Sequence, residues 1–201
     1  MPDGQPQRQK PQTPRTQRQV FPQPAGHHLA QVNLARAVDD LDQPAMAEFM
    51  AALNKVNGIA ERSPGFVWRQ GDPVADARAK AILADPRETY TLSVWETADA
   101  LEFFAWNTVH RRFMNNRHKW FVPPDRAFLA MWWIPTGTTT DFAEAMERLE
   151  YLRAHGPSER AFGWKNLAGT RAWQSEGAPP SRPSPLRPLR RTRQVSRGYA
   201  S

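Results

Sequence analysis

The first notable absence in this chain of 201 residues is that of cysteine. Without a thiol, the chain has no disulfide bond, no thiolate metal site and no cysteine nucleophile. Long apolar runs are absent as well. No apolar run of about seven residues occurs near the amino end, and no run elsewhere approaches about eighteen residues. The sequence therefore predicts neither a secretory signal nor a membrane span. We therefore expect a cytoplasmic protein without membrane contact.

Several recurring catalytic motifs are also missing. The sequence contains no glycine-rich phosphate loop, no nucleophile elbow and no helix with paired metal-binding residues. His27 and His28 are adjacent, and adjacent side chains on a strand point to opposite faces. This pair therefore needs further ligands from elsewhere in the chain to hold a metal ion. We expect no metal site and no resident cofactor.

Proline and positive charge are plentiful, but both concentrate at the two ends. Of the 19 prolines, six lie in residues 1–25 and five in residues 174–201. These ends carry net charges of +3 and +5, which leaves −1 of the total +7 for residues 26–173. Because the ends lack periodic apolar residues, we expect disordered tails at 1–25 and 166–201 around a folded domain at 26–165. The basic tails favour at most weak nucleic-acid binding, and we prefer to interpret them as solvated extensions.

Hydrophobic periodicity between the tails predicts alternating strands and helices. Alternating apolar and polar residues are typical of strands, and apolar residues three or four apart are typical of amphipathic helices. Residues 71–87 begin and end with turn signals and are predicted to form a long loop, in which the alanines could form a helical turn. The order is that of an α+β ferredoxin-like βαββαβ unit with an extra C-terminal helix. The expected strands span 28–35, 66–70, 88–95 and 128–134, and the helices begin after Asp42, Thr97 and Asp141, the second with a break near Asn107 and Thr108.

A ferredoxin-like unit places its two long helices on one face of the sheet and leaves the other face bare. We expect Trp68, Trp95 and one of Trp132 and Trp133 to lie on that uncovered face. So large an exposed apolar surface is rare on a monomer. The sequence therefore predicts a homodimer whose two sheets pack face to face about a two-fold axis.

Several segments between residues 26 and 163 occur in a familiar order: HLAQVNLA, LSVWETADALEFFAWNTVH, RHKWF, LAMWWIPTG and RLEYLRAHGPSERAF. Together they resemble the DUF3291 family of bacterial proteins. The resemblance implies a dimeric α/β barrel, related in fold to antibiotic-biosynthesis-type monooxygenases, chlorite dismutase-like haem proteins and stress-responsive barrel proteins. The family's own activity is unassigned. The chain departs from the family pattern at Thr138, where a His is expected, and it continues beyond the usual end of the family.

Residues 93–134 contain five of the eight Trp, five of the ten Phe and two of the five His. Such density marks a ligand site or an interface. On an unbroken helix, Trp106, His110 and Arg117 form one stripe. His110 could then take a proton from an acidic C–H or phenol, and Arg112 or Arg117 could stabilise the resulting anion. The alternative is a structural His with arginines that extend into water.

Residues expected to contact a substrate are Asn33, Trp68, Trp95, Trp106 and Trp133, although tryptophans are more often core residues. Asn33 belongs to a polar face with Gln31, Thr91 and Ser93. These side chains either position a substrate carbonyl or satisfy each other across a dimer seam, and we favour the seam.

Three functions are consistent with this pattern. The first is a cofactor-independent, monooxygenase-like enzyme that acts on a small aromatic or polyketide-like substrate. The second is a non-catalytic homodimer that binds a small apolar or aromatic molecule or is purely structural. The third is a haem-binding barrel with His110 as axial ligand. The first and third rest on analogy of fold, which hosts many functions.

Overall fold

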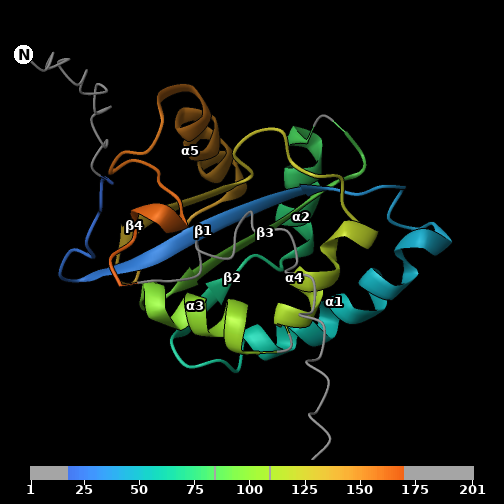
Figure 1. Ribbon diagram of the computed structural model, residues 1–201, viewed down its shortest axis with the longest axis horizontal. Coiled ribbons are helices and arrows are strands. Elements are labelled where there is room, and N and C mark those ends of the chain that lie inside the picture. Colours follow the sequence, from blue (N-terminus) through green and yellow to red (C-terminus); the bar gives the residue numbers. More distant parts are fainter. Residues whose placement is uncertain (1–17, 84, 109, 170–201) are drawn as a thin grey trace, which may run out of the picture.

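The computed structural model describes residues 18–83, 85–108 and 110–169, and most of the two predicted tails, at 1–17 and 170–201, lies outside the described residues (Figure 1). Strands and helices alternate along the described chain. The strands are β1 (His27–Arg36), β2 (Phe66–Arg69), β3 (Glu88–Trp95) and β4 (Leu129–Pro135). The helices are α1 (Ala47–Ala60), α2 (Pro73–Ile82), α3 (Ala98–Asn107), α4 (His110–Asn116) and α5 (Phe142–His155), with short 3-10 turns η1 (Pro44–Met46), η2 (Arg117–Lys119) and η3 (Trp164–Asn166).

The strands form one antiparallel sheet in the order β2-β3-β1-β4. This is the order expected of a ferredoxin-like unit, so the α+β prediction is confirmed, including the extra helix α5 after β4. Register places side chains in rows across the sheet. Ser93 lies opposite Gln31, which lies opposite Met131, and Thr91 lies opposite Asn33 in the next row.

One face of the sheet is covered by α1 and α3. Buried residues of this layer include Leu29 and Trp95 from the strands and Leu101 and Phe104 from α3. Thr97 begins α3, because its side chain accepts a hydrogen bond from the backbone N–H of Ala100 at 3.1 Å. Such a cap satisfies one of the N–H groups that the first turn leaves open. We call this side the α3 face.

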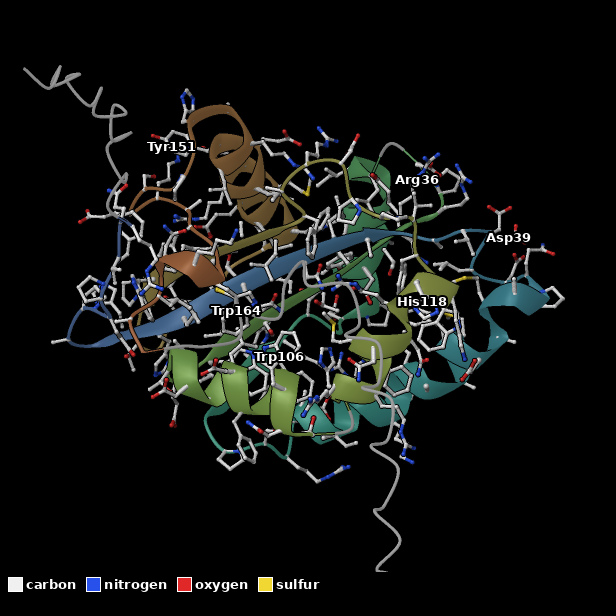
Figure 2. All side chains as sticks on the ribbon, viewed as in Figure 1. Arg36, Asp39, Trp106, His118, Tyr151 and Trp164 are labelled. Atoms are coloured by element: carbon white, nitrogen blue, oxygen red, sulfur yellow. The ribbon has the colours of Figure 1, made fainter. Side chains whose placement is uncertain are left out.

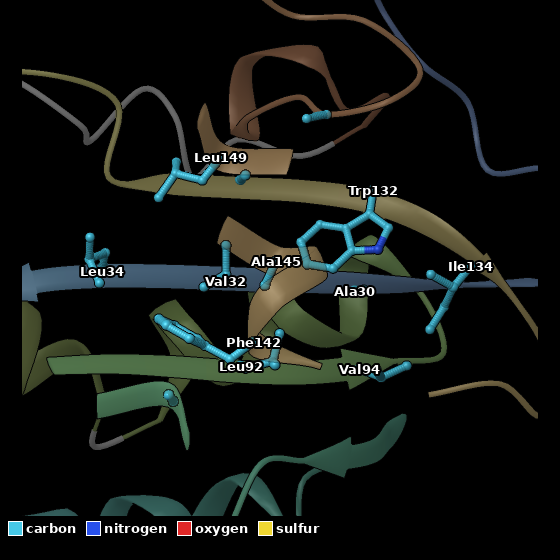
Figure 3. Close-up of a cluster of buried hydrophobic side chains, with 13 residues drawn as sticks. Ala30, Val32, Leu34, Leu92, Val94, Trp132, Ile134, Phe142, Ala145 and Leu149 are labelled. Carbon is cyan, nitrogen blue, oxygen red and sulfur yellow. The ribbon is translucent and has the colours of Figure 1, made fainter. Parts of the chain in front are cut away.

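The opposite face is covered by α5, which packs on β1, β3 and β4 (Figure 3). Trp132 and Leu149 are both 0% exposed in this layer. Figure 1 shows α5 on one side of the sheet and α1, α3 and α4 on the other. The expectation of a bare sheet face is therefore wrong, because the extra C-terminal helix folds back over it. Trp68 and Trp132 lie on this α5 face, whereas Trp95 and Trp133 lie on the α3 face.

Helix α2 corrects the prediction of a loop over residues 71–87. The carboxylate of Asp72 accepts a hydrogen bond from Ala75 N at 2.9 Å, and Pro73 follows in the first turn. Both features favour a helix start. Ala79 is buried, and α2 contacts α5 beside the sheet.

Both terminal segments of the described chain pack on the α3 face, so the folded part extends beyond the predicted limits of 26 and 165. Phe21 is buried and stacks on Phe162, with ring centroids 5.3 Å apart. Phe21 N donates to Asn166 O at 2.8 Å, and Leu167 is buried in the same layer.

Within the part of the chain that the structure describes, none of the helices has the length and apolar character needed to cross a bilayer.

Candidate functional site

His110 is the first residue of α4, directly after the break that the sequence predicts. Helix α3 ends at Asn107, and Thr108 has an extended backbone with φ −116° and ψ −174°. The Thr108 hydroxyl donates to Phe104 O at 2.6 Å and accepts from His110 N at 3.2 Å. One side chain therefore closes α3 and opens α4, and it fixes the backbone on which the imidazole sits.

The protonation of His110 follows from its contacts. Its Nδ1 lies 3.1 Å from the carbonyl oxygen of Ala105. Because a carbonyl only accepts, Nδ1 carries the proton, and in the neutral ring Nε2 has a free lone pair. Burial lowers the pKa of His110 below its ordinary value, and the bond to Ala105 opposes this shift only in part. The ring is thus a neutral base at physiological pH.

A continuous series of ring contacts connects His110 with the end of β3. The ring lies against Phe104, with centroids 4.8 Å apart, and Phe104 stacks on Trp95 at 5.2 Å. Phe66 then meets Trp95 edge-on at 5.3 Å. These rings are buried or partly buried between α3 and the sheet, and Phe104 places apolar surface against the imidazole.

Below these rings, Ser93 is the centre of a buried hydrogen-bond network. Its Oγ accepts from Gln31 Nε2 at 2.8 Å and from Trp95 Nε1 at 2.9 Å. Our preference for a dimer seam at this polar face is therefore wrong. Gln31 and Ser93, the two buried members of the face, bond to each other within one chain.

The exposure of the polar row changes along the strands. Gln31 and Ser93 are buried, Asn33 is partly buried and Thr91 is exposed. Polar side chains thus connect solvent at one end of the α3 face with the buried network.

Among the residues that the structure describes, three buried polar atoms on the α3 face have no hydrogen-bond partner: Asn33 Oδ1, Trp106 Nε1 and Trp133 Nε1. Trp106 and Trp133 pack on the same hydrophobic layer as Leu129, which lies opposite Asn33 in the sheet. Figure 2 shows Trp106 and Trp164 on the same side of the sheet, above α3. An unpartnered buried polar group costs about 1–3 kcal/mol, and a ligand that completes its hydrogen bond would recover that cost.

Comparison with known sequences decides the family. The model described as "Domain of unknown function (DUF3291)" matches residues 28–177. The chain belongs to the DUF3291 family. No curated protein matches this DUF3291 chain.

Two solved structures resemble parts of the DUF3291 chain. PA3566 from Pseudomonas aeruginosa is 16% identical, with a TM-score of 0.37 over 55% of this chain and 95% of its own. NE2512 from Nitrosomonas europaea, a protein of unknown function, is 10% identical, with a TM-score of 0.36 over 57% of this chain and 94% of its own. Both likenesses are too distant to transfer a function.

Among the described residues of the DUF3291 chain, His110 has no hydrogen bond to either predicted arginine. The stripe was predicted for an unbroken helix, whereas the chain breaks between Trp106 and His110 and Arg117 falls in η2. Arg112 and Arg117 are both exposed. Among the described residues, burial and the Ala105 carbonyl are the causes of the His110 pKa shift, and neither guanidinium contributes.

The expected substrate contacts also divide. Asn33, Trp95, Trp106 and Trp133 share the α3 face with His110, whereas Trp68 lies on the α5 face and is separated from them by the sheet. Ser93 and Gln31 were recognised as polar strand residues but not as the central network. The signal for this in the sequence is Ser93 two residues before Trp95, since both side chains then share one face.

Metal ligands do not gather in the described part of the DUF3291 chain, where no three His, Asp or Glu side chains are close enough to hold an ion.

Proposed function

We propose that this chain is a cofactor-independent, monooxygenase-like enzyme that binds a small aromatic or polyketide-like compound on the α3 face and uses His110 as general base. The single observation that carries the proposal is the fixed Nδ1 proton of His110, donated to Ala105 at 3.1 Å. It leaves Nε2 as the basic atom of a partly buried ring beside Phe104. A base with this arrangement suits a weakly acidic C–H or O–H group.

The chemistry requires no group beyond the substrate and dioxygen. Nε2 takes a proton from an activated CH₂ group and becomes an imidazolium, and the substrate becomes an enolate or phenolate. Dioxygen then oxidises this anion. One oxygen atom replaces the two hydrogens of the CH₂ group as a carbonyl, and the other leaves as water.

A test substrate of this type is anthrone, whose CH₂ group is acidic and whose oxidation product is anthraquinone. Dioxygen uptake and the absorbance of the quinone would be followed with the full chain and with His110→Gln. We expect the variant to lose about 100-fold or more of the rate, as is typical when a general base is removed. An unchanged rate in a folded variant would reject His110 as the base.

Haem binding is a second candidate that one observation favours. A His that ligates a metal through Nε2 usually donates its Nδ1 proton to a carbonyl or carboxylate, and His110 does so. Added haem would then give a Soret band that His110→Gln lacks. No such band after haem addition would eliminate this candidate.

A non-catalytic homodimer that binds a small molecule, or is purely structural, is the remaining alternative. A folded chain that binds an aromatic probe but leaves anthrone unoxidised would support it. We also propose a homodimer in either case. Because α5 covers the sheet, the contact must use another surface or displace α5. Light scattering should give twice the chain mass, and the mass of one chain would contradict the proposal.

A further inference from the structure

The Ser93 network has one donor too many. Both Gln31 and Trp95 direct an N–H group at Ser93 Oγ, at 2.8 Å and 2.9 Å. A hydroxyl oxygen that accepts two hydrogen bonds has only its own proton left to offer. Among the described residues nothing accepts that proton, although Ser93 is buried. Ser93 is therefore a donor that lacks an acceptor.

The orientation of the Gln31 amide decides whether Ser93 is one of the unpaired donors. If its oxygen and nitrogen were exchanged, Ser93 would donate to Gln31 Oε1 and would be satisfied. Among the described residues, the buried N–H groups of Trp106 and Trp133 have no partner in either orientation.

Two further donors on the α3 face also lack an acceptor among the described residues. Trp106 Nε1 and Trp133 Nε1 are buried without a partner, against one unpartnered acceptor, Asn33 Oδ1. All of these groups are uncharged. Arg69, the cation opposite Ser93 on β2, already donates to Glu61 at 2.7 Å. The face therefore offers several neutral donors and no free cation in that row.

We propose that the ligand of the α3 face is an uncharged, flat molecule with at least two carbonyl oxygens, of the quinone or diketone class. The inference rests on the proposed function for the location of the site and adds the polar groups of the ligand. Ring surfaces such as Trp95 and Phe104 favour a flat molecule, and unpaired N–H and O–H donors require acceptors. A carboxylate would lack a counter-charge in this row.

The test compares 1,4-naphthoquinone with naphthalene, which has the same rings without the oxygens. The chain has no cysteine, so no thiol can add to the quinone. Eight tryptophans give eight indole N–H resonances, assigned by single Trp→Phe variants of the full chain. We expect the quinone to shift the Trp106 and Trp133 resonances and to bind about fivefold or more tightly than naphthalene.

Trp132 is the matched control, because its Nε1 is equally buried and unpartnered but lies on the α5 face. Trp106→Phe, Trp133→Phe and Ser93→Ala should each weaken quinone binding about fivefold, and Trp132→Phe should not. Thermal melting shows which variants are folded. If Ser93→Ala does not fold, quinone binding by Trp106→Phe and Trp133→Phe still tests the inference.

The outcomes separate this inference from the proposed function. Equal binding of naphthalene and naphthoquinone at Trp106 would overturn the inference and leave a ligand site in place. Shifts confined to Trp132 would also overturn it. If neither probe moves an α3-face indole, the inference and the site fail together. If His110→Gln oxidises anthrone normally but quinone binding depends on Trp106 and Ser93, the inference stands without the base.

Discussion

His110 and Ala105 are joined across a helix break, with the imidazole Nδ1 of the first 3.1 Å from the carbonyl oxygen of the second. The carbonyl belongs to the last turn of α3, and the ring belongs to the first residue of α4. A backbone group that cannot ionise thus fixes the tautomer. This has consequences for pH dependence.

The first prediction concerns the rate. The base must be neutral, and burial lowers its pKa from an ordinary value of 6.5. The rate of anthrone oxidation should therefore stay constant as the pH falls from 8 through about 6.5 and should decline only at lower pH. An acid limb centred above that value would contradict the assignment.

The second prediction concerns stability. Below about pH 6.5 the unfolded chain binds a proton at His110 that the folded chain resists, because the pKa of the folded state is lowered. The free energy of unfolding should therefore fall as the pH drops from 6.5 through the lowered pKa, and this contribution should be constant above 6.5. Urea titrations should show a weaker acid-side decline for His110→Gln. A parallel decline would contradict burial as the dominant cause.

The third prediction concerns Gly65, whose φ is +75° at the start of β2. A Cβ there would lie 2.5 Å from the Ala100 Cβ, whereas one at Gly26, with φ +70°, meets nothing within 4 Å. Gly26→Ala should cost about 1 kcal/mol from backbone strain alone. Gly65→Ala should cost at least about 1 kcal/mol more, because α3 must move. Chemical denaturation of both variants tests this difference, and equal losses would exclude the clash.

The fourth prediction tests the cover of the α5 face. Leu149 is 0% exposed against the sheet, whereas Met50 on α1 is 40% exposed. Leu149→Ala should lower the free energy of unfolding by about 2–5 kcal/mol. Met50→Ala should change it by about 0.5 kcal/mol or less. If the two substitutions had equal, small effects, α5 would not cover the sheet in solution.

Much of the fold could be predicted from local patterns. The strands and the break at Thr108 follow from periodicity and residue type, because period two and period 3.6 are set by backbone geometry. Helix α2 was missed because its alanines make it only weakly amphipathic between two proline-containing turns. Its assignment depends on Asp72 reaching Ala75 N, which is a matter of side-chain geometry.

The site was less predictable, for a different reason. Trp132 and Trp133 are adjacent, so their parity placed them on opposite faces, but the sequence did not indicate that α5 would cover one of them. The position of α5 over this face depends on contacts between residues far apart in the sequence. The stripe assumed one unbroken helix, but the break lies between Trp106 and His110, and α4 ends before Arg117, so the three residues do not share one regular helix.

The contact between Phe21 and Asn166 brings the two ends of the folded part of the chain together, with a backbone hydrogen bond of 2.8 Å. A short peptide could join these ends and new ends could be opened at the exposed turn around Gly137, between β4 and α5. Such a circular permutant would keep every strand pairing and detach α5 from β4 in sequence only. A chain with its segments in this new order should therefore still fold into the structure that positions the His110 imidazole.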